Sequence, residues 1–252
     1  MNFKFYRKLV LSLGLAAALL FIATGQAHAQ MFSVQEDDAS ENRAIPPNNF
    51  YIGIEPVQFD YEGPAMAGSL AGLFEFDGPV IRAKYETFGL EAFIGAGGRL
   101  TGVDDVAFFD IGIRATRGLR LVSNQNFSLQ IPLQIKSSLT SVTNDQVISS
   151  GSQFRQGTLT IGGGGQIGGR LSDDIRVSAG IVPNYGFSFA TGGTFGGQIF
   201  ELETSTRIYF DRVFGNIGIS AGWDYTFKRY DIEENEFDYN FQSNGFLIGI
   251  SF

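Results

Sequence analysis

Apolar and polar residues alternate along several segments of this chain after residue 49. In the clearest segment, 174–189, one face carries aliphatic and aromatic side chains, and the other carries polar residues and glycine. The same alternation recurs in five further segments: 107–116, 127–136, 158–168, 200–211 and 215–228. A period of two residues is typical of strands with one apolar face. A length of about ten residues is what a tilted strand needs to cross a bilayer.

Counting such segments back from the C-terminus gives the expected number of strands. We expect ten, at 49–61, 79–86, 88–98, 106–117, 126–139, 154–168, 174–189, 197–210, 213–228 and 239–252. Eight and twelve remain alternatives, because 62–78 fits either an external loop or a longer second strand. Pro56 lies where the apolar residues of the first strand change from even to odd positions. This change predicts a β-bulge, in which proline is tolerated.

Alternation alone would also fit a soluble sandwich or a lipocalin-like barrel. Aromatic residues, however, gather at strand ends, as in 185–189, 209–210 and 225–227. Short connections such as 170–173 and 211–212 take turns with long polar ones such as 140–153 and 229–238. Aromatic girdles and alternating loop lengths are typical of membrane barrels. We therefore predict an all-β fold, a closed antiparallel up-and-down transmembrane β-barrel.

The N-terminus has the three parts of a secretory signal peptide. Lys4, Arg7 and Lys8 precede a mostly apolar run at 9–25, which Ala27-His28-Ala29 follows as a cleavage motif. The apolar run is short for a membrane-spanning helix of roughly 20 residues. We therefore expect a cleaved signal peptide at 1–29, a flexible acidic periplasmic tail at 30–48, and the barrel at 49–252.

Composition narrows the possible chemistry. Cleavage removes three basic and no acidic residues, so the formal charge changes from −8 to −11, which disfavours nucleic acid as a partner. The chain has no cysteine, and its one histidine, His28, lies in the signal peptide. Serine–histidine and cysteine–histidine mechanisms are thereby excluded, as are imidazole and thiolate metal sites. We expect no enzyme, no cofactor and no metal site.

The C-terminal strand resembles the assembly signal of bacterial outer-membrane proteins, which ends in phenylalanine after alternating apolar residues. Phe246, Ile248, Ile250 and Phe252 occupy those positions, although Leu247 stands where the family usually has glycine. With the signal peptide and the amphipathic strands, residues 49–252 resemble the small porin-like outer-membrane β-barrel families of Gram-negative-type bacteria. The resemblance implies export through the periplasm, integration among outer-membrane lipids and recognition by the barrel assembly machinery. It leaves the oligomeric state open.

Two other motifs have simpler interpretations than a binding site. Gly163, Gly165 and Gly168 match a dinucleotide-binding string, but a turn and another strand follow them instead of the required helix. Glycine in these places relieves crowding in a closed sheet. The acidic loop 229–238 has oxygen ligands but lacks the spacing of a calcium loop, so we interpret it as a solvated surface loop.

Charged residues recur on the polar strand faces, which line the lumen of a membrane barrel. We expect a lumen charge network formed by Arg82, Lys84, Glu91, Asp110, Arg114, Lys136, Arg176, Glu201, Glu203, Arg207, Asp224 and Lys228. The same alternation adds Glu55, Asp60 and Glu86. Such charges should pair, because isolated buried charges are costly. A paired lumen suits a self-plugged barrel or a narrow polar pore, and it disfavours a cavity for hydrophobic ligands.

The expected function is therefore a structural or surface role, or limited passage of small polar solutes. Two alternatives remain: a substrate-specific channel, and an adhesion or partner-binding barrel that acts through external loops 140–153 and 229–238.

Overall fold

The computed structural model describes residues 48–63, 71–124, 126–146, 153–190, 195–231 and 238–252. The predicted signal peptide at 1–29 lies outside the described residues, as does the predicted tail at 30–48 except for Asn48. In the described part of the chain, no helix is long and apolar enough to cross a membrane.

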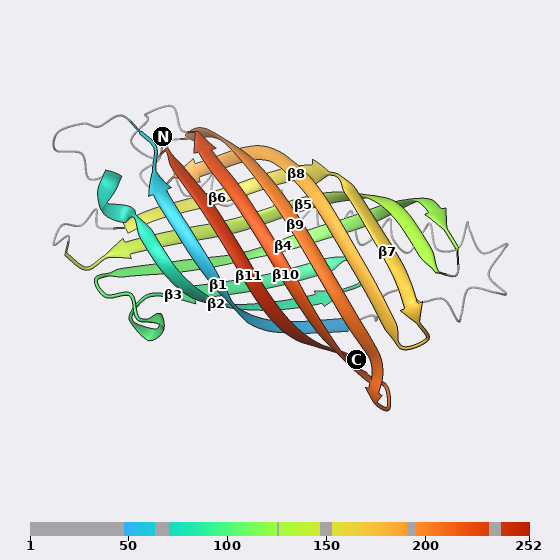
Figure 1. Ribbon diagram of the computed structural model, residues 1–252. Helices are drawn as coiled ribbons and strands as arrows, with labels where there is room; N and C mark the ends of the chain where they lie inside the picture. Colours follow the sequence, from blue (N-terminus) through green and yellow to red (C-terminus); the bar gives the residue numbers. More distant parts are fainter. Residues whose placement is uncertain (1–47, 64–70, 125, 147–152, 191–194, 232–237) are drawn as a thin grey trace. The chain divides into compact units, whose positions relative to one another are not determined.

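One antiparallel sheet contains all the strands of the described residues (Figure 1). The strands are β1 (Asn48–Tyr61), β2 (Phe76–Thr87), β3 (Leu90–Gly97), β4 (Val106–Ser123), β5 (Phe127–Asn144), β6 (Gln153–Gly163), β7 (Gly165–Ser172), β8 (Ile175–Ala190), β9 (Phe195–Phe214), β10 (Ile217–Asp231) and β11 (Tyr239–Ser251). Two short 3-10 helices, η2 (Ala71–Phe74) and η3 (Arg99–Thr101), lie in the connections around β2 and β3.

β6 and β7 are two parts of one barrel strand. Both lie between β5 and β8, and both keep one register with each neighbour across the break at Gly164. The barrel therefore has ten strands, and the predicted number is confirmed.

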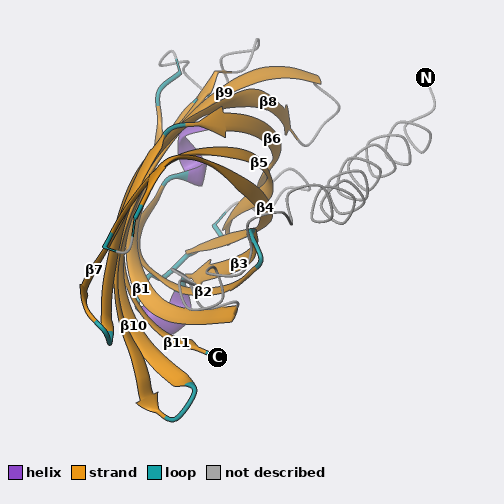
Figure 2. Cartoon of the chain, turned by 90° about the vertical axis from the view of Figure 1, so that its right-hand side faces the viewer, coloured by secondary structure: helices purple, strands orange, loops and turns teal. Residues whose placement is uncertain are grey.

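The sheet closes on itself, because β1 pairs with β11 and β4 pairs with β5. Figure 2 looks along the barrel and shows this ring of strands. The strands are staggered around the ring. A path that steps from each residue to its paired neighbour starts at Gly218 on β10, passes Ser251 and Asn49, and returns to β10 at Tyr230. This displacement along β10 accompanies the strand tilt that a closed barrel requires.

The two ends of the barrel differ in their connections. At the terminal end, where β1 begins and β11 ends, short turns at 88–89, 173–174 and 215–216 join the strands. At the loop end, the connections 62–75, 98–105, 145–152 and 232–238 are longer. This difference is typical of membrane barrels, which have short periplasmic turns and longer external loops.

Several strands are longer than the sequence suggested. The predicted turn at 211–212 is wrong, because β9 continues to Phe214 and the turn follows it. Arg212 has a φ of 57°, and the register with β10 shifts between Ile217 and Ile219, so the polar pair Asp211-Arg212 marks a bulge instead of a turn. The expected loops 140–153 and 229–238 are also shorter, because β5 runs to Asn144 and β10 to Asp231.

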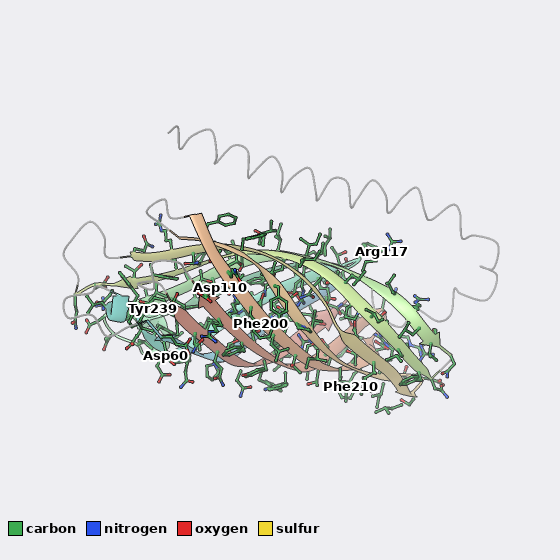
Figure 3. All side chains as sticks on the ribbon, turned by 90° about the horizontal axis from the view of Figure 1, so that it is seen from above. Asp60, Asp110, Arg117, Phe200, Phe210 and Tyr239 are labelled. Atoms are coloured by element: carbon green, nitrogen blue, oxygen red, sulfur yellow. The ribbon has the colours of Figure 1, made fainter. Side chains whose placement is uncertain are left out.

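The predicted bulge at Pro56 is also wrong. Exposure alternates without interruption through β1, and Pro56 pairs directly with Pro79 of β2. The ladder to β11 omits Glu55 and Pro56 and resumes in the same register, so the missing N–H of proline is accommodated without an extra residue. Val57 and Phe59 consequently face the lumen, and Asp60, which was expected there, lies exposed on the outer face near the loop end (Figure 3).

The outer face of the barrel is an apolar belt between two sets of aromatic residues. Ile52 and Ile54, for example, are 53% and 61% exposed. Exposed aromatic residues toward the terminal end are Phe50, Tyr85, Phe88, Phe127, Phe210, Phe214 and Phe252, and those toward the loop end are Phe109, Tyr185 and Phe187. Beyond the belt at the loop end, outer positions become polar at Gln58, Asp60, Asp77, Arg155 and Arg229. Tyr209, expected in a girdle, is instead buried in the lumen.

Candidate functional site

The lumen holds the charged side chains that share the inner faces of the strands. The structure places all twelve residues of the expected network there, together with Glu55 and Glu86. Several carry full side chains almost without solvent contact: Arg82 is 3% exposed, Asp110 2% and Glu201 1%. At such burial the partners of each charge decide whether the arrangement is stable.

One group of ion pairs lies toward the loop end. The Nε atom of Arg82 donates to Glu55 at 2.5 Å, and its Nη1 atom donates to Asp110 at 2.9 Å. The hydroxyl of Thr140 donates to the other carboxylate oxygen of Asp110 at 3.2 Å. One guanidinium thus joins strands β1, β2 and β4 across the lumen.

A second group occupies the centre. Lys136 donates to Glu201 and to Glu203, each at 2.6 Å. Arg114 joins Glu203, at 3.0 Å, to Glu91, at 2.5 Å. Two peripheral contacts complete the group: Gln134 donates to Glu203 at 2.6 Å, and the Nζ atom of Lys228 lies 3.8 Å from Glu201.

A third group lies toward the terminal end. Asp224 accepts two hydrogen bonds from Arg207, at 2.5 and 2.8 Å, and one from Lys84 at 2.6 Å. Arg176 forms a separate bidentate pair with Asp211, at 2.5 and 2.7 Å, and so takes no part in the other groups. Bidentate arginine–carboxylate pairs fix geometry as well as charge.

We use the name charge network for the first two groups together with the pairs of Asp224. Its members are Glu55, Arg82, Lys84, Glu91, Asp110, Arg114, Lys136, Glu201, Glu203, Arg207, Asp224 and Lys228. The network leaves a cavity of about 20 Å³, lined in part by Lys84, Glu203 and Thr226. A cavity needs roughly 10–15 Å³ to hold one water molecule, so this cavity has room for about one.

Glu86 differs from the other lumen acids. It faces the lumen opposite Glu91 on the neighbouring strand, and in the described part of the chain no cation lies within 4.0 Å of its carboxylate. Glu91, by contrast, is held by Arg114. Within the described residues, no three acidic, histidine or cysteine side chains are grouped so as to hold a metal ion.

The lumen near the loop end is filled by apolar and aromatic side chains. We call this cluster the aromatic plug, and its buried members are Val57, Phe59, Phe74, Phe76, Val80, Phe108, Val142, Phe154, Ile199, Tyr230, Tyr239 and Phe241. Phe59 stacks on Tyr239 with ring centroids 4.4 Å apart, and it also meets Phe154 at 5.1 Å. Phe108 joins Phe76, at 5.3 Å, to Phe241, at 5.9 Å.

The plug and the charge network meet at cation–aromatic contacts. The ammonium group of Lys228 lies 4.8 Å from the centre of the ring of Phe241, a plug residue, and that of Lys136 lies 5.1 Å from the centre of the ring of Phe93, which lies outside the plug. Such contacts are favourable between a cation and the face of a ring. The two fillings therefore adjoin at Lys228 and Phe241.

Sequence reasoning missed the aromatic plug, although a signal for it was present. Phe76, Phe108, Phe154 and Phe241 all continue the inward alternation of their strands toward the loop end. The assumption that inward positions are polar along their full length hid this pattern, as did the bulge expected at Pro56.

The four residues of the C-terminal signature share one surface. Phe246, Ile248, Ile250 and Phe252 lie in a row on the outer face of β11 and its end, between 46% and 57% exposed. The backbone N–H of Phe252 donates to the carbonyl of Asn48 at 3.1 Å, which ties the end of the chain to the first strand.

A closed antiparallel barrel with an apolar belt, aromatic girdles and a charged lumen is the architecture of transmembrane β-barrel proteins. No protein-family model matches the chain, and no curated protein matches its sequence.

Among solved structures, the chain is similar to the outer membrane protease OmpT from Escherichia coli, with 10% identity over 81% of this chain and 96% of that chain and a TM-score of 0.36. It is similar to Ail, the attachment invasion locus protein of Yersinia pestis, with 11% identity over 82% and 97% and a TM-score of 0.27. It is also similar to the translocator domain of the autotransporter NalP from Neisseria meningitidis, with 10% identity over 91% of this chain and 98% of that chain and a TM-score of 0.29. These TM-scores are low, so the similarities carry no argument about the role of this chain.

Proposed function

We propose that this chain is an integral bacterial outer-membrane protein whose lumen is closed and whose loop end is presented at the cell surface. The apolar belt supports a bilayer location, because it suits contact with lipid around the ring. The short turns, together with the first and last barrel strands ending there, support assigning the terminal end to the periplasmic side. The exposed row from Phe246 to Phe252 is then the surface that we propose the assembly machinery recognises.

The filling of the lumen by paired charges and packed aromatic rings is the observation that carries this proposal. Ions or polar solutes would have to pass the charge network, whose cavity is about 20 Å³. They would then have to pass the aromatic plug, where Val57, Phe59 and Val80 have no exposed surface. Because the two fillings lie in series, either one alone is sufficient to stop flow.

A closed barrel serves as an anchor for its external connections. Its ten paired strands hold the loop end rigidly in the membrane, so a structural or surface-binding role follows without transport. We assign no catalytic step to the lumen, because its network carboxylates are held in ion pairs and the only histidine is His28.

The bilayer location is tested by placing one charge at two heights on the same strand face. Ile54→Arg puts a charge in the apolar belt and should destabilise the barrel by about 2–4 kcal/mol, whereas Gln58→Arg, beyond the belt, should cost about 0–1 kcal/mol. Urea unfolding of the barrel in lipid vesicles measures both. Equal costs would contradict a bilayer at this position, and planar-bilayer recording tests the closed lumen.

A further inference from the structure

The outer face of the barrel carries a groove toward the terminal end, over β7 to β11. Its volume is about 570 Å³, within the range of roughly 300–1,000 Å³ typical of small-molecule sites. Its lining residues come mostly from outward-facing positions, including Phe127, Ile167, Ile208 and Phe246. The groove is therefore on the lipid side of the wall and separate from the lumen.

The order of large and small residues across the strands produces this groove. One row of paired residues runs Ile167, Ala179, Thr206, Trp223 and Phe246. Two small side chains thus lie between larger ones.

The next row toward the terminal end also has small residues beside larger ones. There Gly169 pairs with Phe127 on one side and with Val177 on the other, and Ala221 pairs with Ile208. Small residues form the floor, and the bulky side chains form the walls.

We propose that this groove binds one acyl chain of a membrane lipid and retains it when the surrounding bilayer is removed. The inference rests on the proposed bilayer location, because the groove lies within the apolar belt that lipid covers. Its side-chain lining is apolar apart from the hydroxyl groups of Ser178 and Thr206, the guanidinium of Arg207 and the indole N–H of Trp223. The guanidinium of Arg207 is already bound by Asp224 in the lumen. Recognition therefore depends on the acyl chain and is independent of the headgroup.

One wall of the groove is held in a fixed orientation. Trp223 donates its indole N–H to the side-chain oxygen of Asn244, and its ring stacks on Tyr225 with centroids 6.2 Å apart. A wall fixed in this way favours retention, because little side-chain freedom is lost when a chain binds. Trp223 is also the single tryptophan of the sequence, so its fluorescence reports on this groove alone.

The test uses phospholipids with brominated acyl chains, which quench tryptophan fluorescence on contact. The barrel is reconstituted in these lipids and then exchanged extensively into a detergent without bromine. Trp223 should be quenched in the bilayer and should stay quenched in detergent, with about one lipid per protein in native mass spectrometry. Retention should be equal for phosphatidylethanolamine and phosphatidylglycerol.

A matched pair of variants separates the groove from the belt in general. Ala179→Leu with Ala221→Leu fills the groove floor and should abolish retention in detergent while leaving quenching in the bilayer. Ala92→Leu with Ala96→Leu adds the same bulk on the outer face of β3 and should leave retention unchanged. Heat-modifiable mobility on gels checks that each variant is folded.

Three outcomes would overturn the inference. Full recovery of fluorescence on exchange would show annular lipid only, and retention in the filled variant would place the lipid elsewhere. Retention of one headgroup class alone would show recognition outside the apolar groove. Absence of quenching in the bilayer itself would contradict the proposed membrane location, which is a different failure.

Discussion

The lumen is filled in two different ways along its length. Along most of its length, charged side chains of the charge network, from seven strands of the ring, meet in pairs, with Lys136 between Glu201 and Glu203 as an example. Toward the loop end, aromatic rings pack on one another, with Phe59 stacked on Tyr239. The charge network depends on the position of individual polar atoms, whereas the aromatic plug depends on the shape and buried area of its side chains.

This difference determines how each half responds to change. A buried ion pair is sensitive to loss of either partner, because the remaining charge is then buried without compensation. An aromatic cluster tolerates exchange of one apolar residue for another of similar volume. The charge network should therefore fix a single arrangement of the strands, whereas the plug should contribute stability that is less sensitive to detail.

The largest effect is expected from a charge placed in the plug. Val57→Arg should destabilise the barrel by several kcal/mol or prevent its assembly, because the residue is fully buried and no described carboxylate lies in the plug. Gln58→Arg, the next residue on the opposite face, should change stability by no more than about 1 kcal/mol. Yields of folded barrel compare the two. If arginine is tolerated at residue 57, this residue does not face the plug, and the bulge first expected at Pro56 would be the correct interpretation.

Removal of one partner from the charge network should have the next largest effect. Lys136→Ala leaves Glu201 and Glu203 without their shared cation and should cost about 3–5 kcal/mol. In Lys136→Met with Glu201→Gln, Glu203 keeps Arg114 and most of that loss should be recovered. Urea titrations of the refolded barrels measure both. A loss below 1 kcal/mol for the single variant would show that the network is hydrated.

A conservative exchange in each half gives the smallest effects and the sharpest comparison. Arg82→Lys removes the fork that reaches Glu55 and Asp110 together, and the loss of a charged hydrogen bond should cost about 1.5–3 kcal/mol. Phe154→Leu should cost less than about 1.5 kcal/mol. Unfolding midpoints in one detergent rank the two variants. A larger loss of stability for Phe154→Leu than for Arg82→Lys would contradict the proposal that the charge network is more sensitive to detail than the aromatic plug.

Alternation in the sequence was sufficient to predict the number of strands and the face on which most residues lie. The structure puts Arg114, Lys136 and Asp224 on the inner faces that this pattern indicates, because successive side chains of a strand point to opposite faces of the sheet. The ion-pair partners of these residues could not be predicted from the alternation. Lys136 of β5 reaches Glu201 of β9 because the barrel closes and its strands tilt, and neither property is encoded locally.

The errors arose where two local signals disagreed. Pro56 coincides with a change in apolar positions, and a bulge would explain both facts equally well. The structure instead turns Val57 and Phe59 into the lumen, where residues from distant strands supply the apolar surroundings. Tyr209 likewise follows Arg207 on the inner face of β9 and packs against Arg176 at 4.8 Å from its ring centre. Only the assembled barrel provides these partners.

Single-channel recording in planar bilayers tests the closed lumen most directly. The unmodified protein should give no steady conductance. Arg114→Ala with Arg207→Ala opens the charge network, and Phe59→Ala with Phe154→Ala opens the aromatic plug, yet each pair alone should remain closed because the other filling is intact. Only the fourfold variant, shown to be folded by its mobility on gels, should conduct, and its unpaired carboxylates should make the current cation-selective. Large, stable, ohmic openings from the unmodified protein would contradict the account.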